Sequence, residues 1–386
     1  MAASTGSGAR SSIPRQPLSG TGDGEAPLCV VHLDTERGWR GGERQAFWLA
    51  RSLRARGHRS IVAARPEAEL FAAARDEGLE TWPTSPRFEV DPVAAWRLAG
   101  RAGEAGADIL HAHTAHAVGL GALATLRTGA ALVATRRVDF PLGRNAGTRW
   151  KYGRVSGLIA ISGAVRDVLT EGGIEAGRIT VVPSGVDLER AIEPASAGTL
   201  EGLGIRSGQP LVVMVAALVP HKSPVTFVRA IAASLQKGAR LQALLVGDGP
   251  LRDQVREERD ALGLGGVLHL AGQRADADAL IAACDVFVLS SREEGLGTVL
   301  LDAMHCGKPV AATQAGGIRD VVEQGMTGLL VPVGDAAALG RAIAELCGDA
   351  SRRAAMGAAG RLRVRGFGVE QTAEGTLGVY RRVLAR

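Results

Sequence analysis

Residues 290–304 read Ser-Ser-Arg-Glu-Glu-Gly-Leu-Gly-Thr-Val-Leu-Leu-Asp-Ala-Met, and this stretch is the most informative part of the chain. It places two carboxylates, Glu294 and Asp302, on either side of the point near Gly297 where we expect a helix to begin. The free N–H groups and the dipole at a helix N-terminus favour an anion such as a phosphate. Carboxylates accept hydrogen bonds from sugar hydroxyls. The stretch therefore fits a ligand with hydroxylated ends and an anionic middle, as in a nucleotide-sugar.

The residues between the two acids allow a backbone to come close to a ligand. Gly295 and Gly297 have no side chain, so we expect the backbone of Gly295, Leu296 and Gly297 to contact the nucleotide-sugar. Thr298 precedes Asp302 by four residues and therefore shares its helix face. These positions complete the predicted binding segment.

The same segment resembles a known family. The spacing from Glu294 to Asp302 is similar to the Glu-x7-Glu signature of family 4 retaining glycosyltransferases, which have the GT-B fold. The family's pattern continues in Gly307-Lys308-Pro309-Val310, in Gly316-Gly317-Ile318-Arg319-Asp320-Val321-Val322 and in Gly325-Met326-Thr327-Gly328-Leu329-Leu330-Val331. One departure is Asp302, which is one methylene shorter than the usual Glu. The resemblance implies that Glu294 holds the hydroxyls of the donor sugar and that Asp302 holds the ribose.

Length and patterning predict two α/β domains. A chain of 386 residues is too long for one ordinary core. Apolar strand candidates alternate with helical stretches, as in parallel α/β architecture. In the first half they are 28–34, 60–64, 108–111, 131–135, 157–161 and 179–182, and in the second half 211–216, 242–246, 267–270, 286–289, 309–312 and 328–331. We expect a disordered tail at 1–26, a first domain at 27–190, a linker at 191–208 and a second domain at 209–368.

The resemblance extends from about Leu28 to the end of the chain. It implies two Rossmann-like parallel-sheet domains facing each other across a cleft, with a helix at 369–386 crossing back to the first domain. By the same resemblance, the first domain binds the acceptor and the second binds the nucleotide-sugar. Residues 181–187, Val-Val-Pro-Ser-Gly-Val-Asp, are similar to the family's interdomain hallmark, with Ser184 where Asn is usual. Ligands of such sheets bind at the carboxyl ends of the strands.

Charge and composition restrict the functional class. The net charge is +5, and residues 136–154 contain six cations against one acid, Asp139. This cluster either attracts a phosphorylated acceptor or an anionic membrane surface, or is simply a solvated basic face. Because aromatic residues make up only 4% of the chain, we do not expect nucleic acid as a partner.

The sequence also bears on localisation. It contains no apolar run of about 18 residues, so no membrane-spanning segment is expected. Residues 1–26 lack the apolar core of a secretory signal. The four cysteines have no metal-ligand spacing, which favours free thiols in a reducing compartment. We expect a cytoplasmic protein, peripheral at most on the inner face of the membrane.

A cation is needed where the diphosphate leaves the donor, because negative charge develops there as the glycosidic bond breaks. Lys222 in the segment Leu218-Val219-Pro220-His221-Lys222 is our candidate. Related enzymes usually have an Arg before this Lys, and Ala217 occupies that position here. The loss of a bidentate phosphate ligand leaves Lys222 and the helix at Gly297 to bind the diphosphate.

Two glycine turns are further candidates. Gly41 and Gly42 follow a strand and precede a helix, and the segment Arg40-Gly41-Gly42-Glu43-Arg44 resembles the family's Gly-Gly-x-Glu-Arg loop. A glycine pair alone more often serves a tight turn of the backbone than a ligand-binding site. Gly247 ends a strand, and by resemblance it flanks the nucleotide. Arg274 lies, by the same resemblance, where the base is held.

Three histidines, His111, His113 and His116, lie at the end of a strand and in the following loop. Three neighbouring imidazoles could ligate a zinc ion, but no fourth ligand of matching spacing follows in the sequence. We therefore expect no metal and treat His111 and His113 as locally packed. By resemblance, His116 lines the site near the reactive carbon of the donor sugar.

Together these observations predict a metal-independent, retaining glycosyltransferase that transfers a sugar from a nucleotide-sugar to a lipid-linked or phosphorylated envelope glycan, such as lipopolysaccharide. The resemblance implies that the leaving diphosphate, rather than a protein nucleophile, takes the acceptor's proton. Two alternatives remain: a GT-B sugar-nucleotide epimerase, and a catalytically inactive GT-B scaffold, which the substitutions at Ala217 and Asp302 would suit.

Overall fold

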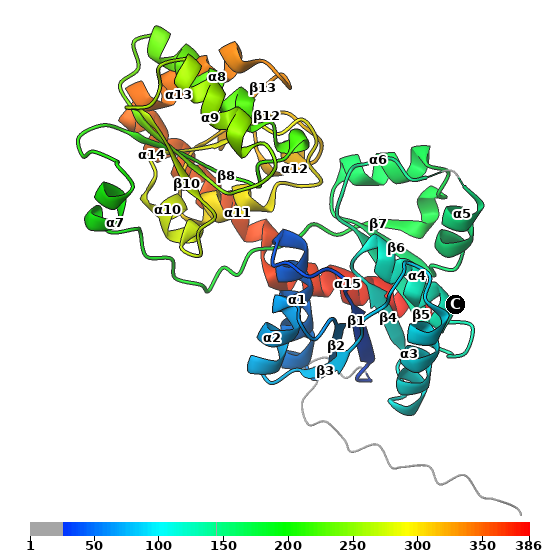
Figure 1. Ribbon diagram of the computed structural model, residues 1–386. Helices are drawn as coiled ribbons and strands as arrows, with labels where there is room; N and C mark the ends of the chain where they lie inside the picture. The colour runs from blue at the N-terminus through cyan, green and yellow to red at the C-terminus, as the bar shows by residue number, and fades with distance from the viewer. Residues whose placement is uncertain (1–25, 144) are drawn as a thin grey trace, which may run out of the picture.

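The computed structural model describes residues 26–143 and 145–386 of the chain, so nearly all of the predicted tail lies outside the described residues. The chain forms two parallel β-sheets, each covered by helices and joined by a linker segment (Figure 1). This is the two-domain α/β architecture that the sequence predicts.

The first sheet has the strand order β3-β2-β1-β4-β5-β6-β7. Its strands are β1 (Cys29–Leu33), β2 (Arg59–Ala64), β3 (Glu80–Pro83), β4 (Ile109–Ala112), β5 (Ala131–Arg136), β6 (Gly157–Ala160) and β7 (Ile179–Val181). Its helices are α1 (Gly41–Ala55), α2 (Glu69–Asp76), α3 (Pro92–Glu104), α4 (Ala115–Ala124), α5 (Ala146–Gly153), α6 (Gly163–Glu171) and the 3-10 turn η1 (Ala176–Arg178).

The second sheet has the order β10-β9-β8-β11-β12-β13. Its strands are β8 (Leu211–Val215), β9 (Gln242–Val246), β10 (Leu268–Gly272), β11 (Val286–Leu289), β12 (Val310–Thr313) and β13 (Gly328–Val331). Its helices are α7 (Ala197–Gly202), η2 (Pro220–Lys222), α8 (Pro224–Gln236), α9 (Arg252–Ala261), α10 (Ala277–Ala283), α11 (Thr298–His305), α12 (Ile318–Val321), α13 (Ala336–Gly348), α14 (Ala350–Arg363) and η3 (Val364–Phe367).

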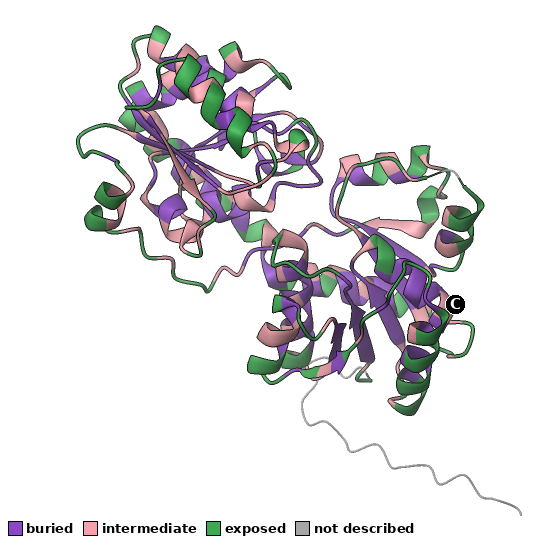
Figure 2. Cartoon of the chain, in the orientation of Figure 1, coloured by how far each residue is buried: buried purple, intermediate pink, exposed green. Residues whose placement is uncertain are grey.

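Residues that alternate along the strands of the first sheet supply two separate apolar layers. Val30 and Ile109 belong to the layer shared with α1 and the last helix, α15 (Val369–Leu384). Their neighbours Val31 and Leu110 belong to the layer on the other face. The central strands of both sheets are accordingly buried along most of their length, whereas β3, β7 and β10 at the sheet edges are largely intermediate or exposed (Figure 2).

Helix α15 leaves the second domain and packs on α1, β5 and β6 of the first (Figure 1). The predicted return of the C-terminal helix is therefore confirmed. The chain crosses between the domains twice, and the two crossings are hydrogen-bonded to each other. The amide of Val186 donates to Phe367 O at 2.8 Å, and the amide of Val369 donates to Val186 O at 3.1 Å.

One strand and several element boundaries differ from the sequence-based expectation. Strand β3, a short edge strand ending in Pro83, matches none of the expected strands. Helix α1 begins at Gly41 rather than at Glu43, so the glycine pair forms its first turn. Strand β10 extends to Gly272, where its register with β9 shifts.

Candidate functional site

Glu294 and Lys222 meet at the carboxyl edge of the second sheet. Lys222 follows β8 and Glu294 follows β11, and these two strands are neighbours. The Lys222 ammonium donates a hydrogen bond to Glu294 Oε2, and Ser291 Oγ donates to the same oxygen at 3.0 Å. The Glu294 side chain is buried, so the ion pair fixes its orientation.

Helix α11 begins directly after this pair. Gly297, the residue before the helix, has φ of 82°, and no side chain caps the helix N-terminus. A Cβ at Gly297 would lie 3.4 Å from Glu294 Cγ. The first-turn amides, the Lys222 ammonium and the Glu294 carboxylate therefore occupy one small region, which can bind an anion next to a hydroxylated group.

Asp302 is bound to the other domain. Its Oδ2 accepts a hydrogen bond of 2.6 Å from Arg44 Nη2 of α1, whereas its buried Oδ1 has no partner among the described residues. Burial raises the pKa of Asp302, and the Arg44 guanidinium opposes that shift. One oxygen of the acid is therefore used by the protein, and the other remains without a hydrogen bond.

The glycine pair lies between elements of both domains. A Cβ at Gly41 would lie 3.0 Å from Thr298 Oγ1, and a Cβ at Gly42 would lie 3.5 Å from the Cδ of Arg137. A Cβ at residue 41 would crowd the Thr298 hydroxyl, whereas one at residue 42 would make an ordinary contact. The structure thus brings Gly41 next to Thr298, at the first turn of α11, and Gly42 next to Arg137 of its own domain.

Leu296 and Gly295 lie on the same loop, and its backbone faces the first domain. A Cβ at Gly295 would lie 2.1 Å from the carbonyl oxygen of Arg137. The Asp139 carboxylate accepts a 2.9 Å hydrogen bond from the amide of Glu294. The segment after β5 and the segment after β11 are therefore in direct contact.

Three other predicted residues make no hydrogen bond or ion pair to this cluster among the described residues. Gly247 has φ of 137°, and a Cβ there would lie 1.9 Å from Ala216 O, so only glycine fits. Arg274 makes two hydrogen bonds of 2.7 Å to Asp276. His116 is exposed on the first turn of α4 and makes no hydrogen bond or ion pair within the described part of the chain.

Asp34, His113 and Arg137 are not among the site residues expected from the sequence. Each is the first residue after a strand, and the three strands, β1, β4 and β5, are adjacent in the sheet. Arg44 was quoted only as part of the glycine loop. These residues could have been predicted from their position, because each is a polar residue directly after a strand, and parallel strands present their carboxyl ends at one edge of the sheet.

Three buried histidines lie beneath this edge. The nitrogens of His32, His111 and His113 lie within 4.8 Å of one another, the only such group that could hold a metal among the described residues. The rings of His32 and His113 are stacked at an interplanar angle of 22°, and His32 Nδ1 is hydrogen-bonded to His113 Nε2 at 3.0 Å, so these two nitrogens are already paired with each other. His111 lies between Tyr380 Oη at 2.5 Å and Thr135 Oγ1 at 2.7 Å.

Hydrogen bonding fixes the proton positions in this cluster. Arg137 Nη2 can only donate, so His113 Nδ1 accepts at 3.1 Å. His113 Nε2 then donates to His32 Nδ1 at 3.0 Å, and the remaining proton of His32 lies on Nε2, which is buried without a partner in the described structure. Burial, assisted by the Arg137 charge, lowers the pKa of His32 to about 3. The imidazoles are neutral hydrogen-bonding groups, as expected for packed histidines.

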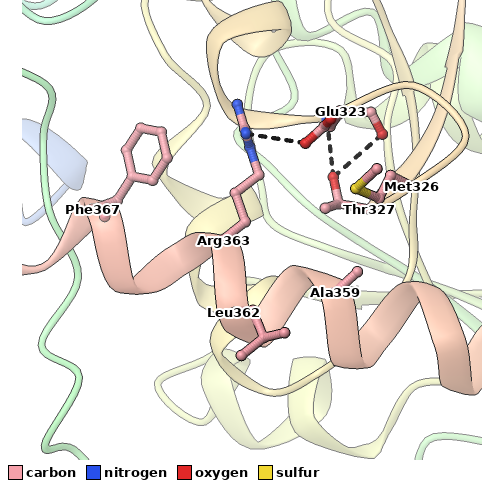
Figure 3. A pocket seen from close by; sticks show the side chains of 8 residues that line it. Glu323, Met326, Thr327, Ala359, Leu362, Arg363 and Phe367 are labelled. Carbon is pink, nitrogen blue, oxygen red and sulfur yellow. Dashed lines mark hydrogen bonds and ion pairs between the residues drawn. The ribbon is translucent and has the colours of Figure 1, made fainter.

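A separate open pocket of about 580 Å³ lies between η3, α14 and the turn before β13 (Figure 3). Met326, Leu362 and Phe367 supply apolar walls, and Arg363 pairs with Glu323 at 3.3 Å. It shares no lining residue with the Glu294 and Lys222 region.

Two parallel-sheet domains joined by a double crossing, with an uncapped helix N-terminus at the carboxyl edge of the second, fit the GT-B architecture of glycosyltransferases. Family models match both halves of the chain: Glycosyltransferase Family 4 over residues 39–190, and Glycosyl transferases group 1 over residues 199–363. The chain belongs to the GT-B glycosyltransferases.

Individual relatives carry the comparison further. The chain is 34% identical over 270 residues to D-inositol 3-phosphate glycosyltransferase of Kineococcus radiotolerans, which covers 63% of this chain and 61% of that protein. It is 34% identical over 195 residues to a GDP-mannose-dependent phosphatidylinositol monomannoside mannosyltransferase of Corynebacterium glutamicum. This match covers 47% of the present chain and 50% of the relative. The chain thus spans between half and about three fifths of these relatives' length.

Among solved structures, Anabaena Alr3699/HepE in complex with UDP superposes with a TM-score of 0.80 at 23% identity, covering 92% of this chain and 100% of that one. This likeness confirms the predicted fold.

Proposed function

We propose that the protein is a retaining glycosyltransferase that moves a sugar from a nucleotide-sugar donor to a hydroxyl group of an acceptor, without a metal ion. The observation that carries the proposal is the contact of Glu294 with Lys222 in front of the N-terminus of α11. This arrangement offers positive charge for a diphosphate and a carboxylate for sugar hydroxyls within one region.

Each group has a role in the proposed reaction. Lys222 and the amides of α11 stabilise the departing diphosphate as it gains charge. Glu294 accepts hydrogen bonds from the donor sugar, and Asp302 Oδ1 accepts one from the ribose. The backbone at Gly247 and the Arg274 side chain flank the nucleotide, and His116 lies near the donor sugar.

Retention follows from attack on the face that the leaving group occupies. The bond from the sugar's reactive carbon to the phosphate oxygen breaks, the bond to the acceptor oxygen forms, and the acceptor's proton passes to the departing phosphate. No protein nucleophile is required. Closure of the two domains over the donor would exclude water and limit hydrolysis.

The donor is tested first, because ligands that bind the folded protein raise its melting temperature. UDP-glucose, UDP-N-acetylglucosamine, GDP-mannose and the free nucleotides UDP and GDP form the panel. The names of relatives mention GDP-mannose and UDP, which supports this choice. We expect at least one nucleotide-sugar to raise the melting temperature by several degrees without added divalent metal and in the presence of a chelator. No shift with any of them would contradict the proposal.

We also propose a lipid-linked acceptor at the cytoplasmic surface of a membrane. One relative is named as a phosphatidylinositol monomannoside mannosyltransferase and another, from Rhizobium meliloti, as a lipopolysaccharide core biosynthesis glycosyltransferase. Among the described residues, no helix has the length and apolar character needed to cross a bilayer. Contact with a membrane would therefore have to be made by the surface of the folded domains.

Helix α3 and the loop before it supply a suitable surface. Phe88, Val93 and Trp96 are 72%, 59% and 58% exposed, and α3 shows a largely exposed outer face (Figure 2). Arg127 lies over the Trp96 ring at 5.6 Å. Exposed aromatic residues beside arginines suit the interface of an anionic bilayer.

Vesicle sedimentation tests this contact. The protein should bind phosphatidylglycerol vesicles more than phosphatidylcholine vesicles, and high salt should weaken the binding. Trp96→Ala combined with Phe88→Ala should release most of it. Leu362→Ala is the matched control, because Leu362 is 64% exposed but lies on the other domain. Equal binding by the double variant and the control would exclude this surface.

A further inference from the structure

Asp34 and Arg137 lie at the carboxyl edge of the first sheet with buried polar atoms that the protein leaves unpaired. Asp34 Oδ1 accepts a hydrogen bond of 2.9 Å from the amide of Glu36, but Oδ2 has no partner. Arg137 donates from Nη1 to Ser184 at 3.3 Å and from Nη2 to His113 at 3.1 Å, but Nε has none among the described residues. Leaving such atoms unpaired costs free energy, so each needs an explanation.

The two side chains are neighbours in space. Asp34 directly follows β1 and Arg137 directly follows β5, with β4 between them in the sheet. The amide of Asp34 donates to Ala63 O at 3.1 Å, which extends the ladder and fixes the position of this residue. The charges of Asp34 and Arg137 interact, yet no hydrogen bond joins the two side chains. They are therefore not a closed structural ion pair.

The edge that carries them faces the reaction centre. The carbonyl of Arg137 lies against Gly295, and Gly42 of the glycine loop lies against the Arg137 side chain. Both unpaired atoms belong to the first domain, whereas Glu294 and Lys222 belong to the second. A ligand held by Asp34 and Arg137 would consequently meet the donor from the opposite side.

The combination of charges selects the chemistry of that ligand. Where Asp34 is ionised, a phosphate would accept from Arg137 but would be repelled by the Asp34 carboxylate, whereas an ammonium group would be attracted to Asp34 but repelled by the Arg137 guanidinium. A hydroxyl is neutral and can both donate and accept. Two neighbouring hydroxyls, as on a sugar or a cyclitol ring, would satisfy both unpaired atoms at once.

We propose that Asp34 and Arg137 form the acceptor subsite, which binds two adjacent hydroxyls of a sugar or cyclitol ring. One hydroxyl donates to Asp34 Oδ2, and the oxygen of the next accepts from Arg137 Nε. This inference rests on the proposed function and names the acceptor class that it leaves open. Asp34 and Arg137 position the acceptor, and the reacting groups remain those of the donor site.

Saturation-transfer NMR with free polyols tests the subsite on the whole chain, with UDP or GDP present, whichever stabilises the protein more. The probes are myo-inositol, D-mannose, D-glucose and N-acetyl-D-glucosamine. The wild-type protein should transfer saturation to at least one of them. Asp34→Asn and Arg137→Gln should reduce that signal at least tenfold.

Arg136→Gln is the matched control, because Arg136 is the preceding residue and hydrogen-bonds the carbonyls of Val138 and Phe140 instead. It should keep the polyol signal. Melting curves check that each variant folds, and Arg137→Lys, which keeps the charge, replaces Arg137→Gln if that variant does not.

Calorimetry of nucleotide binding distinguishes a defect in the donor site from a defect in the acceptor subsite. We expect UDP or GDP to bind the Asp34 and Arg137 variants within about twofold of the wild-type affinity. A matching loss of nucleotide binding would place the two residues in the donor site and overturn the acceptor assignment. A wild-type protein that binds nucleotide but no polyol, or an Asp34→Asn signal equal to that of Arg136→Gln, would also overturn it.

Discussion

The carboxylate of Glu294 accepts hydrogen bonds from Lys222 and Ser291, so its neighbours hold it in one orientation. Glu294→Gln keeps the shape but gives up the charge that strengthens hydrogen bonds to the donor sugar. We expect sugar transfer to fall by about 10²-fold or more, the usual scale for a transition-state hydrogen bond, with the fold retained. Glu293→Gln, the exposed neighbour, should remain active. Similar activities for the two variants would remove Glu294 from the reaction.

Asp34 should reduce stability at neutral pH. Burial raises its pKa from 3.8 to about 7, so the folded protein binds this proton more tightly than the unfolded chain. The stability that the group contributes is fully present below pH 3.8 and is lost as the pH rises to about 7. At about 1.4 kcal/mol per pKa unit, the loss is at most ~4 kcal/mol.

Asp34→Asn removes this titration. We therefore expect the variant to melt at a higher temperature than the wild-type protein at pH 8, with the difference shrinking towards pH 4. Thermal melts across that range measure it. A gain in stability together with a loss of polyol binding is the pattern expected of a functional residue rather than a structural one. A difference independent of pH would contradict the assignment.

At the scale of elements, the loop before α11 fits against the segment after β5 only because residue 295 is glycine. A Cβ would lie 2.1 Å from Arg137 O, a distance at which one of the two backbones must move. Gly295→Ala should therefore abolish sugar transfer by displacing Glu294, while each domain stays folded. Gly265→Ala, which adds a Cβ in open space, is the control. An active Gly295→Ala protein would show that this contact is dispensable.

Most strands followed from apolar patterning, and the exception has a physical cause. All the strands of the second sheet correspond to an expected apolar run. Strand β3 is only four residues long, pairs on one side and includes Pro83, which cannot donate to a ladder. Its short, mixed sequence gave no alternation, and its existence depends on pairing with β2.

The site was predictable where its residues lie in one stretch of sequence. The local sequence of residues 294–302 is enough to predict a helix start flanked by two acids, with no knowledge of tertiary contacts. Arg44 pairs with Asp302 across 258 positions, and no local pattern reveals such a contact. Asp34 and Arg137 become neighbours only through the strand order, which places β1 and β5 on either side of β4.

At the scale of the whole molecule, the two domains are joined by their paired crossings and by direct side-chain contacts. The Asp320 carboxylate accepts a 2.7 Å hydrogen bond from the amide of Gly163, and Asp139 accepts from Glu294. Arg44 adds an ion pair to Asp302 whose side chains are 19% and 3% exposed. These contacts join the two domains away from the paired crossings, so they help to hold the domains in the arrangement seen here.

Arg44→Gln should shift the molecule towards an open state. Removing one partner of a buried ion pair typically costs about 3–5 kcal/mol, and here that cost falls on the closed arrangement because the pair joins the two domains. Small-angle X-ray scattering without nucleotide should give a larger radius of gyration for the variant, and a saturating nucleotide should reduce the difference. Arg56→Gln is the control, since Arg56 lies at the end of the same helix but pairs with Glu370 of α15, which packs on the first domain. Equal radii for the two variants would mean that Arg44 does not hold the domains together.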